Sequence, residues 1–194
     1  MHRQPGRAVN KYAGFFPEVL RMSRREALKY IATGVAGLLL PKSLLANEGL
    51  RVIDLYSIHT GERLKTTYWV DGHYIKQALS DINYLLRDHR ADEVHPIDVR
   101  LLDFLYAICC SFEASKVIVI SGYRTPATNA YLRRISSGVA RESYHMYGRA
   151  IDFYIEGVEL SQVRNLAIAL GLGGVGYYPS SGFIHLDTGP FRTW

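Results

Sequence analysis

The strongest constraint on the fold lies in one seven-residue stretch, RAIDFYI at residues 149–155. Its side chains alternate, with Ile151, Phe153 and Ile155 on one face and Asp152 on the other. Successive side chains of a β-strand point to opposite sides, so this pattern is typical of a strand with one buried face. We therefore expect a sheet whose apolar face is covered and whose other face displays a carboxylate.

A second stretch near the end of the sequence, FIHLDTG, has the same character. Ile184 and Leu186 occupy one face of this expected strand, and His185 and Asp187 share the other. An apolar face buries against helices, which leaves the histidine and the carboxylates on the opposite face. If the two strands are neighbours, Asp152 and His185 can meet.

The remaining patterns indicate a single α+β domain. Helices come first and strands mostly afterwards, without the regular alternation of a doubly wound sheet. A further helix is expected from Thr125-Pro126, because proline is favoured in the first turn. The other expected elements are a hairpin around His59-Thr60-Gly61, a buried strand in KVIVIS, and helices at about 75–86, 98–111 and 160–172.

The positive charge of the chain is confined to its first part. The formal net charge is +5, but residues 1–46 carry eight Lys and Arg against two Glu, so residues 47–194 have a net charge of −1. Nucleic-acid binding needs a basic patch on the folded domain. The charge distribution therefore argues against a nucleic-acid partner.

Residues 1–46 have the layout of an export signal. Arg24 and Arg25 precede a short apolar run, Ile31–Leu40, and Ala46 supplies a small residue at a plausible cleavage point. A membrane-spanning helix needs about 20 apolar residues. We therefore expect a leader of the twin-arginine type at 1–46, which implies the twin-arginine export machinery as a partner, and no stable transmembrane segment after processing.

Two alternatives remain open for this leader. It could instead be a basic amphipathic anchor, and Met22 could be the true start, because the signal needs nothing before it. In each case residues 47–194 form the functional domain.

The residues expected to meet on the sheet have the chemistry of a metal site. Asp152 and His185 can be joined by His145, which lies seven residues before Asp152 across a turn at Gly148. Two histidines and one carboxylate leave a fourth position free, as in catalytic zinc sites. The residues alone leave open the alternative that these histidines are ordinary surface or core side chains.

Three motifs resemble one enzyme group. SYHMYGRAID fits Ser-x-His-x-x-Gly-x-Ala-x-Asp at every fixed position, ISGYRTP follows upstream, and GGVGYYPSSGFIHLDTGPFRTW ends the sequence. Together they resemble the D-alanyl-D-alanine metallopeptidase, lysostaphin and hedgehog group, and within it the murein endopeptidase K branch. The resemblance covers about residues 50–194 and implies a small antiparallel sheet that carries the metal site, with helices packed on it.

The same resemblance implies roles for individual residues. His145, Asp152 and His185 would bind Zn²⁺. Ser143, Arg124 and Tyr123 would bind the substrate peptide, and Arg124 would also stabilise its carboxylate or the developing oxyanion. A guanidinium suits both tasks because its donors are fixed in a plane.

One position departs from the family pattern. Many relatives have an acid three residues before the last histidine ligand, as general base, but this chain has Gly182 there. Asp187 is our candidate for the base, because it shares a strand face with His185. The competing interpretation is that Asp187 fixes the ring of His185 by a hydrogen bond.

By this resemblance the chain is expected to be a periplasmic zinc endopeptidase. Its substrates would be peptidoglycan stem peptides, with a preference for bonds between two meso-diaminopimelate residues. Two other functions remain possible: a noncatalytic cell-wall binding module on the same scaffold, and a carboxypeptidase that removes a terminal D-alanine.

Overall fold

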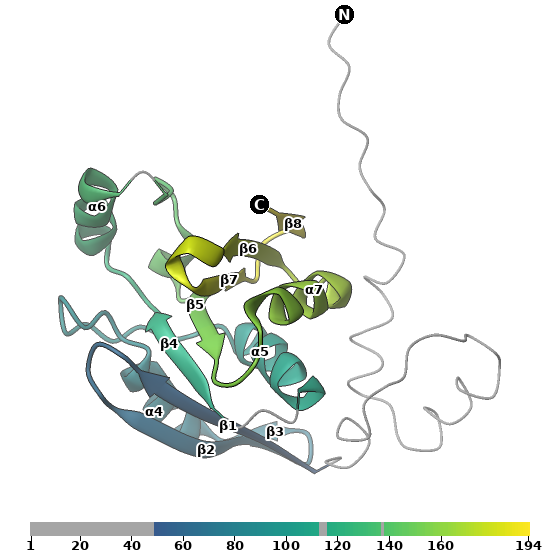
Figure 1. The fold of residues 1–194 in the computed structure, drawn as a ribbon. Coiled ribbons are helices and arrows are strands. Elements are labelled where there is room, and N and C mark those ends of the chain that lie inside the picture. Colours follow the sequence, from purple (N-terminus) through teal and green to yellow (C-terminus); the bar gives the residue numbers. More distant parts are fainter. Residues whose placement is uncertain (1–48, 113–115, 137) are drawn as a thin grey trace, which may run out of the picture. The chain divides into compact units, whose positions relative to one another are not determined.

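The computed structural model describes residues 49–112, 116–136 and 138–194. Within these residues the chain forms one mixed sheet, with the strand order β3-β2-β1-β4-β5-β7-β6-β8 (Figure 1). The strands are β1 (Leu50–Ser57), β2 (Arg63–Val70), β3 (His73–Tyr74), β4 (Val117–Ser121), β5 (Ala150–Ile155), β6 (Gly174–Tyr178), β7 (Phe183–Asp187) and β8 (Arg192–Thr193).

Four α-helices and two 3₁₀ turns connect these strands in the described part of the chain. They are α4 (Lys76–Leu85), α5 (Val99–Ser111), α6 (Pro126–Ile135), η1 (Tyr144–Tyr147), α7 (Leu160–Leu170) and η2 (Pro179–Ser181). The α+β class predicted from the sequence is confirmed.

The helix boundaries follow from capping. The side chain of Asp98 accepts a hydrogen bond from the backbone N–H of Arg100 and begins α5. Thr125 does the same for Thr128 at the start of α6, where Pro126 takes the first position. The cap of α7 lies at Glu159, slightly before the position expected near Ser161, a shift within the usual uncertainty of helix ends.

The core lies between the sheet and the helices. Figure 1 shows α5 and α7 together on the sheet, where α5 packs against β1 and β5 and α7 packs against β5, β6 and β7. Phe153, Ile184 and Leu186 have no exposed surface. Burying each such side chain contributes about 1.5–3 kcal/mol. This burial explains why β5 and β7 turn their polar residues to the other face.

The sheet is larger than predicted and is not purely antiparallel. Strand β1 pairs with β4 in parallel, and β8 pairs with β6 in parallel. Alternation predicts which face of a strand is buried, but it does not predict the neighbour of that strand. The hairpin of β1 and β2 is therefore seen as part of the same sheet only in the folded chain.

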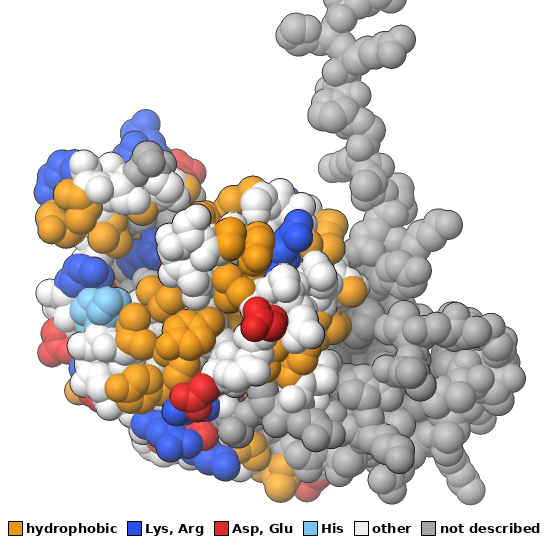
Figure 2. Space-filling model, in the orientation of Figure 1, with side chains coloured by type: hydrophobic (Ala, Val, Ile, Leu, Met, Phe, Trp, Pro, Cys, Tyr) orange, Lys and Arg blue, Asp and Glu red, His pale blue; other side chains and the backbone are white. Residues whose placement is uncertain are grey.

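The export leader expected at residues 1–46, and its boundary with the domain at 47, lie outside the described residues. Within the described residues, no helix has the length and apolar character needed to cross a bilayer. On the face that Figure 2 shows, the Lys and Arg side chains of these residues fall into several separate groups with hydrophobic side chains between them.

Candidate metal centre

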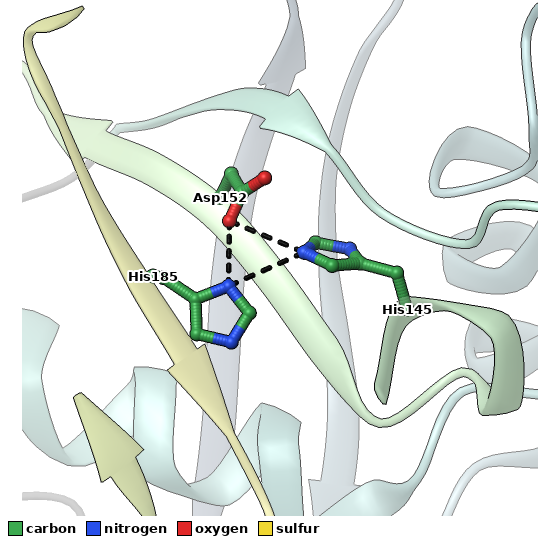
Figure 3. A group of neighbouring side chains, drawn as sticks. All are labelled: His145, Asp152 and His185. Carbon is green, nitrogen blue, oxygen red and sulfur yellow. Dashed lines mark hydrogen bonds and ion pairs between the residues drawn. The ribbon is translucent and has the colours of Figure 1, made fainter. Parts of the chain in front are cut away.

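Three side chains from three elements converge at one point (Figure 3). Asp152 of β5 and His185 of β7 are direct partners across the sheet, as the two strand patterns predicted. His145 approaches from η1. The Oδ1 atom of Asp152 lies 2.7 Å from Nδ1 of His185 and 3.2 Å from Nε2 of His145, and the two histidine nitrogens are 3.3 Å apart.

A short turn delivers His145 to this point. The Ser143 hydroxyl accepts a hydrogen bond from the backbone N–H of His145 and caps η1. Gly148 ends the turn with φ of +62°, and a Cβ atom there would lie 2.1 Å from the carbonyl oxygen of Pro96. Only glycine combines this backbone conformation with such close contact. The glycine of the motif is therefore explained by its backbone conformation together with this packing.

Each histidine is held by a partner on its far side. Nδ1 of His145 donates to the carbonyl oxygen of Gly122 over 2.6 Å, so Nε2 is left with a lone pair that faces Asp152. Nε2 of His185 donates to Oδ2 of Asp187 over 3.1 Å, which leaves Nδ1 facing the same point. Metal-binding histidines commonly have such outer partners, which set the tautomer and the ring orientation.

The electrostatics also suit a cation. Burial lowers the pKa of His145, which favours the neutral ring that can act as a ligand. Burial alone would raise the pKa of Asp152, but His145, His185 and Arg124 hold it well below its ordinary value. Burial also acts to lower the pKa of His185, yet hydrogen bonds to Asp152 and Asp187 outweigh it and the net shift is upward. The carboxylate of Asp152 and the lone pair of His145 thus face one point, and Nδ1 of His185 would offer a second lone pair when a cation takes the place of its proton.

These residues fit a zinc ion. Tetrahedral zinc with bonds of about 2.0–2.1 Å separates its ligand atoms by roughly 3.4 Å. Two of the three separations, 3.2 and 3.3 Å, match this value. The third, 2.7 Å, is the hydrogen bond between Asp152 and His185. The three residues line a cleft of about 490 Å³, which leaves room for a water and a substrate group at a fourth position.

Asp187 lies behind His185 and away from the cleft. Its side chain has no exposed surface, and it accepts hydrogen bonds from Arg192 and from the backbone N–H of Gly189 as well as from His185. Burial raises its pKa, but these partners lower it more, so the net pKa is well below the ordinary value. A buried carboxylate with this many partners is better placed to orient His185 than to take a proton from water. The structure thus favours the second of the two interpretations for Asp187.

Replacing Asp187 by asparagine distinguishes these two roles. If Asp187 orients His185, we expect zinc affinity to fall about 10–100-fold, and activity to recover when zinc is in excess. If Asp187 is the base, kcat stays low at saturating zinc. Competition with a chelator measures the affinity, and Asp92→Asn, at an exposed carboxylate, is the control.

Arg124 stands at the edge of the triad. Its Nε donates to the hydroxyl of Ser121 over 2.7 Å, and its Nη2 contacts Oδ2 of Asp152. The residue lines the cleft, and its guanidinium has five donors in total. The structure therefore brings Arg124 into the cleft beside the three candidate ligands, as the sequence motif predicted.

Ser143 and Tyr123, the two other predicted substrate-binding residues, lie in different surroundings. Ser143 lines the cleft and also caps η1. Tyr123 lies elsewhere: its hydroxyl donates to Glu93 and its ring stacks on His95 at a centroid distance of 4.6 Å. Since Tyr123 is buried and is not among the residues that line the cleft, we propose that it supports the loop that carries Arg124 rather than binding substrate.

Sequence reasoning missed three residues around the site. The buried Asp88 accepts hydrogen bonds from the backbone N–H and hydroxyl of Thr125, next to Arg124. Arg192 holds Asp187, and Trp194 lines the cleft. Arg192 and Trp194 lie in the ending GPFRTW of the third motif, which was the available signal for them, whereas Asp88 belongs to no recognisable local pattern.

Comparisons with known proteins give one consistent family. The family model described as "Peptidoglycan L,D-endopeptidase MepK" matches residues 45–194. Peptidoglycan L,D-endopeptidase MepK of Escherichia coli (strain K12) is 43% identical over 170 residues, which are 87% of this chain and 93% of that protein. Probable peptidoglycan L,D-endopeptidase MepK of Haemophilus influenzae is 44% identical over 169 residues, 84% of this chain and 90% of that protein.

Proposed function

This chain belongs to the peptidoglycan L,D-endopeptidase MepK family, and from that membership we propose that it is a zinc-dependent endopeptidase with His145, Asp152 and His185 as the metal ligands. It is a peptidase that hydrolyses peptidoglycan cross-links. The metal identity and the individual residue roles are the parts that we propose.

One observation carries the proposal for the metal. Nε2 of His145, Nδ1 of His185 and Oδ1 of Asp152 lie within 2.7–3.3 Å of one another, and both outward ring nitrogens are occupied by other partners. Three acceptors that face one buried point repel each other unless a cation or a proton lies between them. A zinc ion bound there would lower the pKa of a water molecule toward 7 and polarise the scissile carbonyl.

The chain's own residues would position the peptide. Arg124 would donate to the substrate carboxylate or to the oxyanion that develops at the scissile carbonyl, since such donors stabilise charge most in a site with little water. Ser143, which lines the cleft, would donate a hydrogen bond to the stem peptide. Asp187, braced by Arg192, would keep Nδ1 of His185 aimed at the metal.

The bond that we propose as substrate joins two meso-diaminopimelate residues in a 3–3 cross-link. The relatives are named L,D-endopeptidases, and the bond in this cross-link joins an L-centre to a D-centre. The cleft suits such a charged peptide because Arg124 and Arg192 line it, while Glu142 offers a carboxylate to an amino group.

Peptidoglycan lies outside the cytoplasmic membrane, so an enzyme that hydrolyses it acts there. We propose the periplasm as the compartment and the twin-arginine machinery as the export route. The support for both is the leader sequence, with Arg24 and Arg25 before a short apolar run.

Purified muropeptide dimers test the proposed reaction directly. We expect the zinc-loaded protein to convert 3–3 cross-linked dimers to monomers, with the mass of one water added for each bond, and to act much less on 4–3 cross-linked dimers. Liquid chromatography with mass detection follows both reactions, and protein treated with a chelator is the control.

Each alternative function predicts another outcome. Dimers that stay intact but bind tightly would contradict hydrolysis and favour a noncatalytic binding module, for which the acid missing at Gly182 is the main support. Loss of a terminal D-alanine without cross-link cleavage would favour a carboxypeptidase.

A further inference from the structure

Trp194 lies beside the candidate metal centre. Its indole ring lines the cleft, and its centroid is 5.3 Å from that of the His185 ring, with the two planes tilted by 49°. No metal-binding or acid–base role is available to an indole, because it has one N–H donor and no ionisable group. Its position next to a ligand residue therefore calls for another explanation.

The backbone places this ring with little freedom. Trp194 donates its backbone N–H to the carbonyl of Val175 and accepts at its own carbonyl from Tyr177, which extends the parallel pairing of β8 with β6. Gly176, between these two residues, is the cross-strand partner of His185. A Cβ atom on Gly176 would lie 2.8 Å from two carbon atoms of the indole, so the ring rests directly on the glycine backbone.

Polar groups contact the ring at its edge and over its plane. Its Nε1–H donates to the hydroxyl of Tyr178 over 2.7 Å, and the guanidinium carbon of Arg192 lies over the ring, 4.9 Å from its centroid. The residue is nevertheless 48% exposed. A large aromatic side chain that is held rigidly, yet exposed in a cleft, is typical of a residue that packs against a ligand.

We propose, on the basis of the function proposed above, that Trp194 is a substrate-binding residue whose exposed ring surface packs against the stem peptide next to the scissile bond. An extended peptide advances about 3.3 Å per residue. A ring 5.3 Å from His185 therefore meets residues within about two positions of the bond that the metal centre would cut. The indole ring would pack against the aliphatic carbons of those residues.

Steady-state kinetics on muropeptide dimers give the first test. Trp194→Ala should raise KM about tenfold and leave kcat nearly unchanged, because it removes binding shared by ground state and transition state. Gly176→Ala should have the same effect, since its methyl group would displace the indole while Trp194 is still present. Trp194→Phe should fall between these variants and the wild type.

Fluorescence gives a second test that does not depend on turnover. The chain has two tryptophans, Trp69 and Trp194, and Trp69 lies on β2, near the other edge of the sheet from β6. In Trp69→Phe protein treated with a chelator, adding dimers should change the emission of Trp194 with saturation. In the matched Trp194→Phe protein, where Trp69 is the remaining reporter, the emission should stay constant.

The outcomes separate this inference from the proposed function. If wild-type protein cleaves dimers, but Trp194→Ala keeps its KM and the Trp69→Phe emission does not respond, Trp194 is not a binding residue and the endopeptidase assignment stands. A fall in kcat or zinc content at constant KM would also overturn the inference, because it would mean that Trp194 only supports His185. If the wild type cleaves nothing, the proposed function fails, and the emission of Trp69→Phe protein still decides whether Trp194 binds the peptide.

Comparing two substrates identifies the contacted group. A peptide dimer without sugar should show the same KM increase for Trp194→Ala as the dimer that carries disaccharides. An increase confined to the sugar-bearing dimer would overturn the peptide contact in favour of a sugar contact.

Discussion

Replacing Asp152 by alanine is expected to abolish both zinc retention and cross-link hydrolysis. The carboxylate contributes the Oδ1 atom that faces both histidines, and it is the anionic member of the triad. Loss of an outer partner alone weakens metal binding about 10–100-fold, so loss of a ligand should weaken it more. Metal analysis after dialysis and the muropeptide assay measure the two effects.

The corresponding change His145→Ala should have the same result. His145 is buried, so its removal also opens space in the interior, and thermal unfolding must be followed to confirm that the variant folds. His73→Ala is the matched control, because His73 is exposed on β3. A His145→Ala protein with full activity would refute its assignment as a ligand.

Replacing Arg124 is expected to lower kcat about 10²–10³-fold while zinc is retained, the size of effect seen when an oxyanion donor is lost. Arg124→Lys should be nearly as damaging as Arg124→Ala. A single ammonium group cannot hold Ser121 and Asp152 and also present a planar pair of donors to the substrate. Arg133→Lys, at an exposed arginine of α6, is the matched control.

Zinc content separates two explanations for any loss in the Arg124 variants. If zinc is lost along with activity, the main task of Arg124 is to hold Asp152 in place rather than to bind substrate. Full kcat in Arg124→Lys would contradict the planar-donor argument.

Much of the site could be predicted because strand alternation is a local property. The pattern of Ile151 and Phe153 around Asp152 determines the face on which the carboxylate lies, and Ile184 and Leu186 do the same for His185. The structure pairs these two strands in the register that brings Asp152 opposite His185.

Other features could not be predicted because they depend on contacts between distant segments. Asp187 shares a strand face with His185, as expected, but its burial comes from Arg192 and the loop at Gly189. Tyr123 belongs to the same motif as Arg124, yet Glu93 and His95 hold it away from the cleft. A motif shows which residues belong together, but not which of them face the ligand.

The sequence by itself determined the α+β class and the buried faces of β5 and β7, and the resemblance of its motifs to a known enzyme group implied the three side chains that meet at the candidate metal centre. These features could be predicted because hydrophobic periodicity and turn residues act within a few positions along the chain. The tertiary structure alone decided the mixed sheet of the described residues, the buried position of Asp187 and the packing of Trp194 on Gly176. These depend on the pairing of strands and on close packing between segments, and no local pattern encodes them.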